Sequence, residues 1–223
     1  MQVTQRPFAG APATTIALII LVACMAAPIL AAQVVDRVIA VVSGTVLMLS
    51  DARAALELGL FDPGAGRDPI EAAMRWLIDR QLVLDETARG ERVDVDPDAL
   101  GEALDGVRQR FRSEDDYRRA LASLGLDDRA LRRLVRDTLV ARLYVERRFD
   151  SMLPAAEEDL RDYYASHASR FVRNGRQLSF DEALADVTAA LQQERRTQAV
   201  SAWMERLRRR AEIRIVYVPA DSR

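Results

Sequence analysis

The side chains that could do chemistry are few, and the first to consider is the only histidine, His167. It stands beside Ser166 and close to Ser169, but a serine nucleophile needs both a histidine base and an acid that orients it. The place of His167 at the polar end of an expected helix favours a surface residue instead. The adjacent carboxylates Glu157 and Glu158 are typical of a favourable charge at a helix N-terminus rather than of an acid–base pair. We therefore predict no catalytic residue.

Sites for metals, cofactors and nucleic acids are not expected either. A zinc site takes three or four cysteine, histidine or carboxylate ligands, whereas the chain has one histidine and one cysteine. It has no glycine-rich phosphate loop of recognised spacing. The formal net charge of −2 argues against a broadly basic nucleic-acid binder. Every cation is an arginine, and clusters such as Arg132, Arg133 and Arg136 alternate with leucines as on solvated helix faces.

The first 32 residues have the pattern of a secretory signal. They contain one basic residue, Arg6, and no acidic residue, and their apolar run ends in two alanines. We predict cleavage there, which would leave residues 33–223 without a cysteine in a periplasmic or other extracytoplasmic compartment. Two alternatives stay open: lipidation at Cys24, and retention of the leader as a membrane anchor. The protein would meet the membrane only through this leader.

Caps, prolines and glycines divide the rest of the chain into short elements. Two segments rich in β-branched residues, within 37–49, flank Ser43-Gly44 and predict a tight hairpin. Ser50 is expected to cap the helix that follows. The predicted helices cover about 51–58, 69–89, 97–111, 113–125, 127–149 and 155–168. Because these helices are short, their core must come from packing several of them together.

The last predicted helix is the longest. It begins at a capping box formed by Ser179 and Glu182 and runs to about Arg210. Its apolar positions fall into two groups, which are separated by the polar stretch 192–198. We therefore predict that this helix bridges two packing surfaces across a more solvated middle.

A terminal strand is predicted over 213–218, where apolar residues occupy alternate positions. We expect it to pair with the N-terminal hairpin, so that the substitution Ile215→Asp would open the domain. The predicted fold class is thus mainly α with a small antiparallel sheet.

The run Val-Asp-Arg-Val-Ile-Ala-Val-Val-Ser-Gly-Thr-Val-Leu-Met-Leu-Ser-Asp at 35–51 resembles the opening of the SurA-like periplasmic chaperone and prolyl isomerase family. The segment 113–126 looks like a short helix of that family with its glycine stop, and the helix at 129–149 follows in the family's order. Asp-Tyr-Tyr at 162–164, with Phe171, resembles the stretch that directly precedes a parvulin-type isomerase domain in the family.

The resemblance implies a SurA/trigger-factor-type peptide-binding helical domain over 33–223. The N-terminal hairpin and the closing helix and strand at 179–218 would complete this single domain, with a shortened connector at 155–178. Only seven residues, 172–178, separate Phe171 from the capping serine, and no parvulin domain fits there. We therefore expect no prolyl isomerase activity.

The function that the resemblance implies is an ATP-independent chaperone for unfolded or partly folded proteins during export or envelope assembly. Such a site needs exposed, adaptable apolar surface with a polar rim. The favoured peptide-binding candidates sit beside charged neighbours: Tyr117, Phe149, Met152 and Tyr164. The wider candidate set adds Phe61, Trp76, Phe111, Tyr163 and Phe171.

Two other classes of function stay open. One is an adaptor that uses the same fold to bind a single dedicated partner or to form a homodimer. The other is an enzyme whose isomerase site has no recognised motif.

Overall fold

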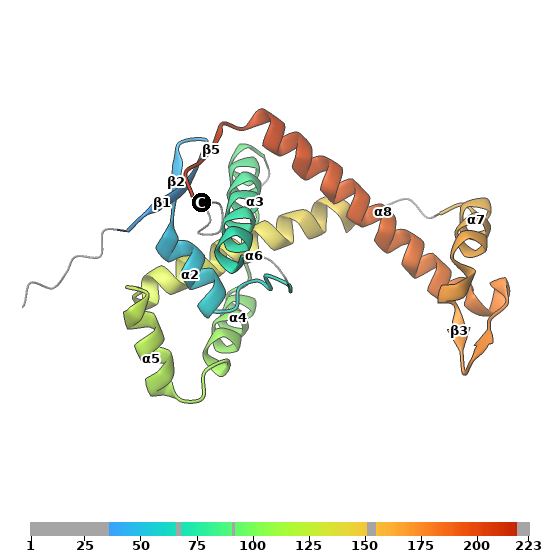
Figure 1. The fold of residues 1–223 in the computed structure, drawn as a ribbon, viewed down its shortest axis with the longest axis horizontal. Coiled ribbons are helices and arrows are strands. Elements are labelled where there is room, and N and C mark those ends of the chain that lie inside the picture. Colours follow the sequence, from blue (N-terminus) through green and yellow to red (C-terminus); the bar gives the residue numbers. More distant parts are fainter. Residues whose placement is uncertain (1–35, 66–67, 91, 151–154, 218–223) are drawn as a thin grey trace, which may run out of the picture. The chain divides into compact units, whose positions relative to one another are not determined.

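The computed structural model describes residues 36–65, 68–90, 92–150 and 155–217, so the expected leader with Cys24 and the candidate Met152 lie outside the described residues. The first elements of the described part are the strands of a hairpin, β1 (Val38–Val42) and β2 (Thr45–Met48) (Figure 1). Both turn residues have positive φ, 48° at Ser43 and 88° at Gly44. Turns of this kind match the twist of the flanking strands, so the predicted tight hairpin is confirmed.

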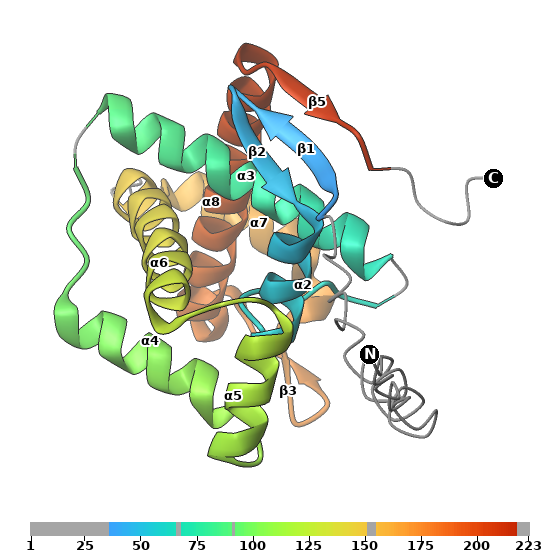
Figure 2. The same ribbon diagram turned by 90° about the vertical axis from the view of Figure 1, so that its left-hand side faces the viewer.

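The strand β5 (Ile213–Ile215) pairs antiparallel with β1 and completes a sheet in the order β2-β1-β5 (Figure 2). The predicted closure by the C-terminal strand is therefore confirmed. The strand is shorter than predicted because the backbone N–H groups of Val216 and Tyr217 both donate to the carbonyl oxygen of Ile39, which ends the regular ladder. Ile215 is 58% exposed, so the structure does not support the expectation that Ile215→Asp would open the domain.

Helices make up most of the described chain. They are α2 (Leu49–Glu57), α3 (Pro69–Arg89), α4 (Pro97–Gln109), α5 (Glu114–Ser123), α6 (Asp128–Asp150), α7 (Glu157–His167) and α8 (Phe180–Arg210). The short 3₁₀ turn η1 (Ala168–Arg170) follows α7. The fold class is thus mainly α with a small antiparallel sheet, as predicted.

The start of α2 differs from the prediction. Its N-cap is Met48 rather than Ser50, since β2 runs into the helix without a loop. The carboxylate of Asp51 accepts a hydrogen bond from the Met48 N–H, at 2.8 Å. The hydroxyl of Ser50 instead donates to the carboxylate of Asp36, which also accepts from the Ser50 N–H. Ser50 therefore fastens the chain just before β1 to the first turn of α2.

Three apolar cores hold the elements together. The sheet core joins β1, β2, α3 and the C-terminal part of α8, with Ile39, Leu77 and Trp203 among its buried members. The helical core packs α2, α4, α5 and α6 around side chains such as Leu58 and Leu131. The satellite core lies between α7 and the N-terminal part of α8. Because α6 contributes Ala141 to the sheet core and Leu131 to the helical core, it joins the two.

The helix α8 serves two of these cores. Its buried residues in the satellite core end at Leu191, and those in the sheet core begin at Trp203. No residue of α8 between these two is buried. The predicted bridging helix with a solvated middle is confirmed, and Figure 1 shows it as one unbroken element.

A second hairpin occupies the connector before α8, and the sequence analysis did not predict it. The strands β3 (Val172–Arg173) and β4 (Arg176–Gln177) pair antiparallel around a turn with φ of 53° at Asn174 and 75° at Gly175. Asn-Gly is a strong signal for this turn type. The strands are only two residues long and exposed, so they lack the alternating apolar pattern that predicts strands.

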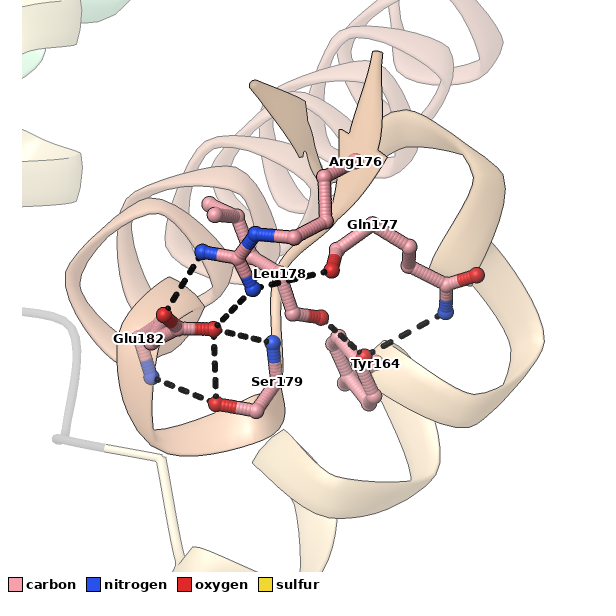
Figure 3. Close-up of polar contacts among 6 residues, drawn as sticks. All are labelled: Tyr164, Arg176, Gln177, Leu178, Ser179 and Glu182. Carbon is pink, nitrogen blue, oxygen red and sulfur yellow. Dashed lines mark hydrogen bonds and ion pairs between the residues drawn. The ribbon is translucent and has the colours of Figure 1, made fainter. Parts of the chain in front are cut away.

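Polar contacts fix the start of α8 beside this hairpin (Figure 3). Arg176 forms a two-pronged ion pair with Glu182, at 2.8 and 3.0 Å. The Glu182 carboxylate also accepts from the Ser179 N–H at 2.8 Å, which completes the predicted capping box. The hydroxyl of Tyr164 donates to the carbonyl oxygen of Leu178 and accepts from the Gln177 amide. The hairpin, α7 and the first turn of α8 are therefore held together by hydrogen bonds.

Among the described helices, none combines the length and the apolar character needed to cross a membrane.

Candidate peptide-binding groove

An apolar groove of about 460 Å³ lies where α3 packs against α6, and we call it the α3–α6 groove. Its lining comes from α3, from α6, from one residue of α8 and from the loop after α2. The lining residues are Leu60, Trp76, Asp79, Arg80, Val83, Thr138, Ala141, Arg142, Val145, Glu146 and Met204.

The floor of the groove is apolar and well packed. Val83, Ala141 and Met204 are each 9% exposed or less and belong to the sheet core. Methionine is an adaptable side chain that fits irregular partners. The indole of Trp76 forms one wall and stacks on Phe61, with 5.2 Å between ring centres and 13° between planes. The groove can thus receive an apolar side chain without a rearrangement of its floor.

The spacing of α3 explains why these side chains meet. Trp76, Arg80 and Val83 follow one another at intervals of four and three residues, so they share one helix face. The adjacent face carries Met74, Leu77 and other buried members of the sheet core. Trp76 and Arg80 therefore stand at the border between the packed face and solvent, where α6 comes alongside.

Three of the four charged side chains that line the groove already have partners. Asp79 accepts two hydrogen bonds from Arg208 of α8, at 2.6 and 2.9 Å, and this contact raises the pKa of Arg208. Arg142 lies 3.6 Å from Glu146, one turn along α6. These pairs leave little net charge at the rim.

Arg80 is the exception. Burial lowers the pKa of its guanidinium, while the charges of Asp137 and Asp51 act in the opposite direction without forming an ion pair. Its Nη1 donates to the Thr138 hydroxyl over a long 3.4 Å, and its Nε has no hydrogen-bond partner among the described residues. The guanidinium carbon lies 5.1 Å from the centre of the Trp76 ring. The groove thus contains a half-buried cation with one fully buried nitrogen, Nε, that makes no hydrogen bond to the described residues.

Two further hollows are less suited to an apolar ligand. One, of about 450 Å³, is lined mainly by the charged residues Glu86, Arg89, Arg147 and Arg148. The other, of about 420 Å³, lies between α3 and β5 and has an apolar base of Met74 and Ile78 with charged pairs around it.

Comparison with known proteins concerns the fold alone. No protein-family model and no curated protein matches the chain. A solved structure does match, from work on two related SurA-like chaperones of Campylobacter jejuni, the virulence factor PEB4 and the periplasmic protein Cj1289. The TM-score is 0.51, with 10% sequence identity, over 81% of this chain and 99% of that chain. The fold is SurA-like.

Within the SurA-like fold, none of the three favoured peptide-binding candidates that the structure describes, Tyr117, Phe149 and Tyr164, lines the α3–α6 groove. Tyr117 is 5% exposed and packs in the helical core against Phe111. Phe149 is half-buried and meets Trp203 edge-on, with 5.6 Å between ring centres. Burial engages both side chains in packing, and their role in peptide binding stays a prediction.

Of the other two candidates, the structure describes only Tyr164. Tyr164 is half-buried in the satellite core, where it stacks on Phe171 and its hydroxyl is bound to Leu178. Met152 lies outside the described residues. Of the wider candidate set, Trp76 does line the groove, and Phe61 stacks behind it.

Arg80 was not singled out from the sequence. An arginine four residues after a tryptophan on an amphipathic helix is ordinary, and the sequence contains many arginines. The signal that marks Arg80 is its partial burial without an acidic side chain in contact, which arises from α6 packing over α3. That is a property of the tertiary structure.

The only histidine lies where a surface residue was expected. The ring of His167 stacks on Tyr163, and its Nδ1 lies 3.0 Å from the Tyr163 carbonyl oxygen and 3.1 Å from the Ser166 hydroxyl. Neither contact is with a carboxylate that could orient a catalytic base. Over the described parts of the chain, no three acidic, histidine or cysteine side chains are placed to hold a metal ion.

Proposed function

We propose that this protein is an ATP-independent, extracytoplasmic chaperone that binds extended segments of unfolded exported proteins in the α3–α6 groove. The observation that carries the proposal is the groove itself, an open apolar hollow with a tryptophan wall and a methionine in its floor, on a SurA-like fold. The leader at residues 1–32 supports the extracytoplasmic location.

The size and composition of the groove suit the binding of short segments of an extended polypeptide. A volume of about 460 Å³ lies within the range of roughly 300–1,000 Å³ that is typical of pockets for small ligands. It can take one or two side chains but not a folded domain. A methionine and a half-buried aromatic wall adapt to different side chains, as promiscuous binding requires.

We further propose that the protein lacks prolyl isomerase activity. The β3–β4 hairpin and its flanks fill the place after Phe171 where family members carry their parvulin domain. A proline-limited refolding assay tests this part. Refolding at the uncatalysed rate agrees with it, and a rate that rises with protein concentration contradicts it.

The chaperone activity is tested by light scattering of a denatured outer-membrane or secreted protein, with and without the purified protein and without nucleotide. We expect suppression of aggregation at near-equal concentrations. Trp76→Ala should weaken the suppression several-fold, because it removes one wall of the groove. Val172→Ala is the matched control, since Val172 is an exposed apolar residue of β3 that lies outside the groove. Equal activity of Trp76→Ala and the parent would exclude this groove as the site.

A dedicated adaptor is the competing function, and one observation favours it. Ile215 and Val216 expose more than half of their surface at the edge of the sheet, where an added strand or a second copy could pair. A pull-down that yields one tight partner, together with no suppression of aggregation, would favour the adaptor over the chaperone.

A further inference from the structure

We infer that the α3–α6 groove selects extended segments that carry an acidic side chain next to a large apolar one, with Arg80 receiving the carboxylate. This inference rests on the proposed function, because it names the class of segment that the proposed chaperone prefers.

The first step is the state of Arg80. Arg80 is half-buried, and its Nε is fully buried. A charge withdrawn from water is normally paired, since the loss of hydration is costly unless a partner replaces it. Yet no carboxylate of the described residues lies within 4.0 Å of the Arg80 nitrogens. Its one side-chain hydrogen bond, to Thr138, is 3.4 Å long. An unused cation of this kind is costly for the free protein and is compensated when an anion binds.

The second step excludes the nearby acids as hidden partners. Asp79 is held by Arg208, and Glu146 by Arg142. Asp51 accepts from the Met48 N–H at the start of α2. Asp137, on α6, acts on Arg80 only at longer range. Among the described residues, Arg80 is therefore the one charged side chain of the groove lining that has no oppositely charged group in contact.

The third step is the apolar surface beside the cation. Trp76, Val83 and Met204 line the same hollow as Arg80. A ligand that satisfies both features has an apolar side chain on this surface and a carboxylate at the guanidinium. A charge-assisted hydrogen bond in an apolar setting is stronger than one to a neutral amide, so a carboxylate is preferred to a peptide carbonyl.

The source of the carboxylate is an acidic side chain within the client. A chaperone of the proposed type takes segments from anywhere along an unfolded chain, whereas each client has one C-terminal carboxylate. Glutamate or aspartate beside leucine, phenylalanine or another large apolar residue is thus the class of segment that the groove fits.

The test uses two peptides of apolar residues around one central glutamate or glutamine, both acetylated and amidated at their ends. Binding to the purified full protein is followed by calorimetry. We expect the glutamate peptide to bind about tenfold more tightly, as one charge-assisted hydrogen bond predicts. In Arg80→Gln this preference should disappear. In Arg75→Gln, a control at an exposed arginine of α3 that pairs with Glu71 outside the groove, it should persist.

The outcomes separate the two proposals. Equal binding of both peptides to the parent protein would overturn the role of Arg80 and leave the chaperone function standing. No binding of either peptide, together with no suppression of aggregation, would overturn the chaperone function. A third peptide, the glutamine peptide with a free C-terminal carboxylate, tests the other source of the anion. If it binds more tightly than the glutamate peptide, the ligand is a chain end and the assignment to internal acidic residues is wrong. The comparison on the parent protein does not depend on how well any variant folds.

Discussion

Arg80 lies one helical turn after Trp76 on α3, and its guanidinium carbon is 5.1 Å from the centre of the indole ring. This cation–π contact offsets part of the cost of burying Arg80, since an aromatic face attracts a cation most strongly where water is excluded. It does not replace a carboxylate. The contact with Trp76 therefore stabilises the Arg80 charge only in part, and a carboxylate of a ligand would stabilise it further.

If Arg80 is retained for binding rather than for stability, its removal should stabilise the fold. Arg80→Met fills the same space with an apolar chain, and we expect the free energy of unfolding to rise by about 1 kcal/mol. Urea denaturation measures the change. Arg75→Met is the control, because Arg75 is exposed and paired only with Glu71, and its effect should be within about 0.5 kcal/mol of zero. A clear loss of stability in Arg80→Met would mean that the guanidinium is a structural element.

The end of the sheet is tied to the beginning of α3 by one hydrogen bond. The hydroxyl of Tyr217 donates to the Asp68 carboxylate at 2.9 Å and lowers its pKa, while the same carboxylate caps α3 by accepting from Ile70. Tyr217→Phe should lose about 1 kcal/mol of unfolding free energy. Asp68→Ala should lose more, because the cap is lost as well. Thermal melts of both variants measure the two losses of stability. A larger loss in Tyr217→Phe than in Asp68→Ala would contradict this expectation.

Acid should loosen the start of α8. Two hydrogen bonds from Arg176, followed by those of Ser179, lower the pKa of Glu182 to about 2 from an ordinary value of 4.5. Because the pKa is lower in the folded state, the stabilisation is complete above pH 4.5 and is lost as the pH falls toward 2. Glu182→Gln should flatten the pH dependence of hydrogen exchange in the first turn of α8 across this interval. Glu205→Gln, later in the same helix, serves as the control and should leave that dependence unchanged.

The two faces of the sheet should respond differently to a charge. Ile39 is fully buried in the sheet core, so Ile39→Asp should unfold the domain at ordinary temperature. Ile215 is 58% exposed, so Ile215→Asp should change the unfolding free energy by about 0.5 kcal/mol or less. Circular dichroism melts distinguish the two. If the melting temperature of Ile215→Asp is as low as that of Ile39→Asp, the domain needs the Ile215 side chain to hold β5 in the sheet.

The elements most accurately predicted from the sequence are those with strong local signals. The helix α3 begins at Pro69 after its Asp68 cap and ends before Gly90, as predicted, since each of these residues acts through its own backbone geometry. The capping box of Ser179 and Glu182 likewise fixes the start of α8. The N-cap Ser50 was wrong because Asp36, which is distant in sequence, competes for its hydroxyl.

The groove could not be predicted in the same way. Its lining joins Trp76, Thr138 and Met204, which lie on three helices far apart in the sequence. The sequence marks each of them as apolar or polar but does not indicate which helices meet. Tyr117 illustrates the limit, since its charged neighbours suggested a surface residue, whereas its ring faces inward against Phe111.

The position of β1 between β2 and β5 has a kinetic consequence. One partner of β1 is available as soon as the hairpin has been synthesised, but the other, Ile213–Ile215, emerges only after α8 is complete. Loop closure over such a separation slows folding, and until then β1 presents an unpaired edge. A nascent chain of this protein therefore exposes an unpaired strand edge for most of its own synthesis.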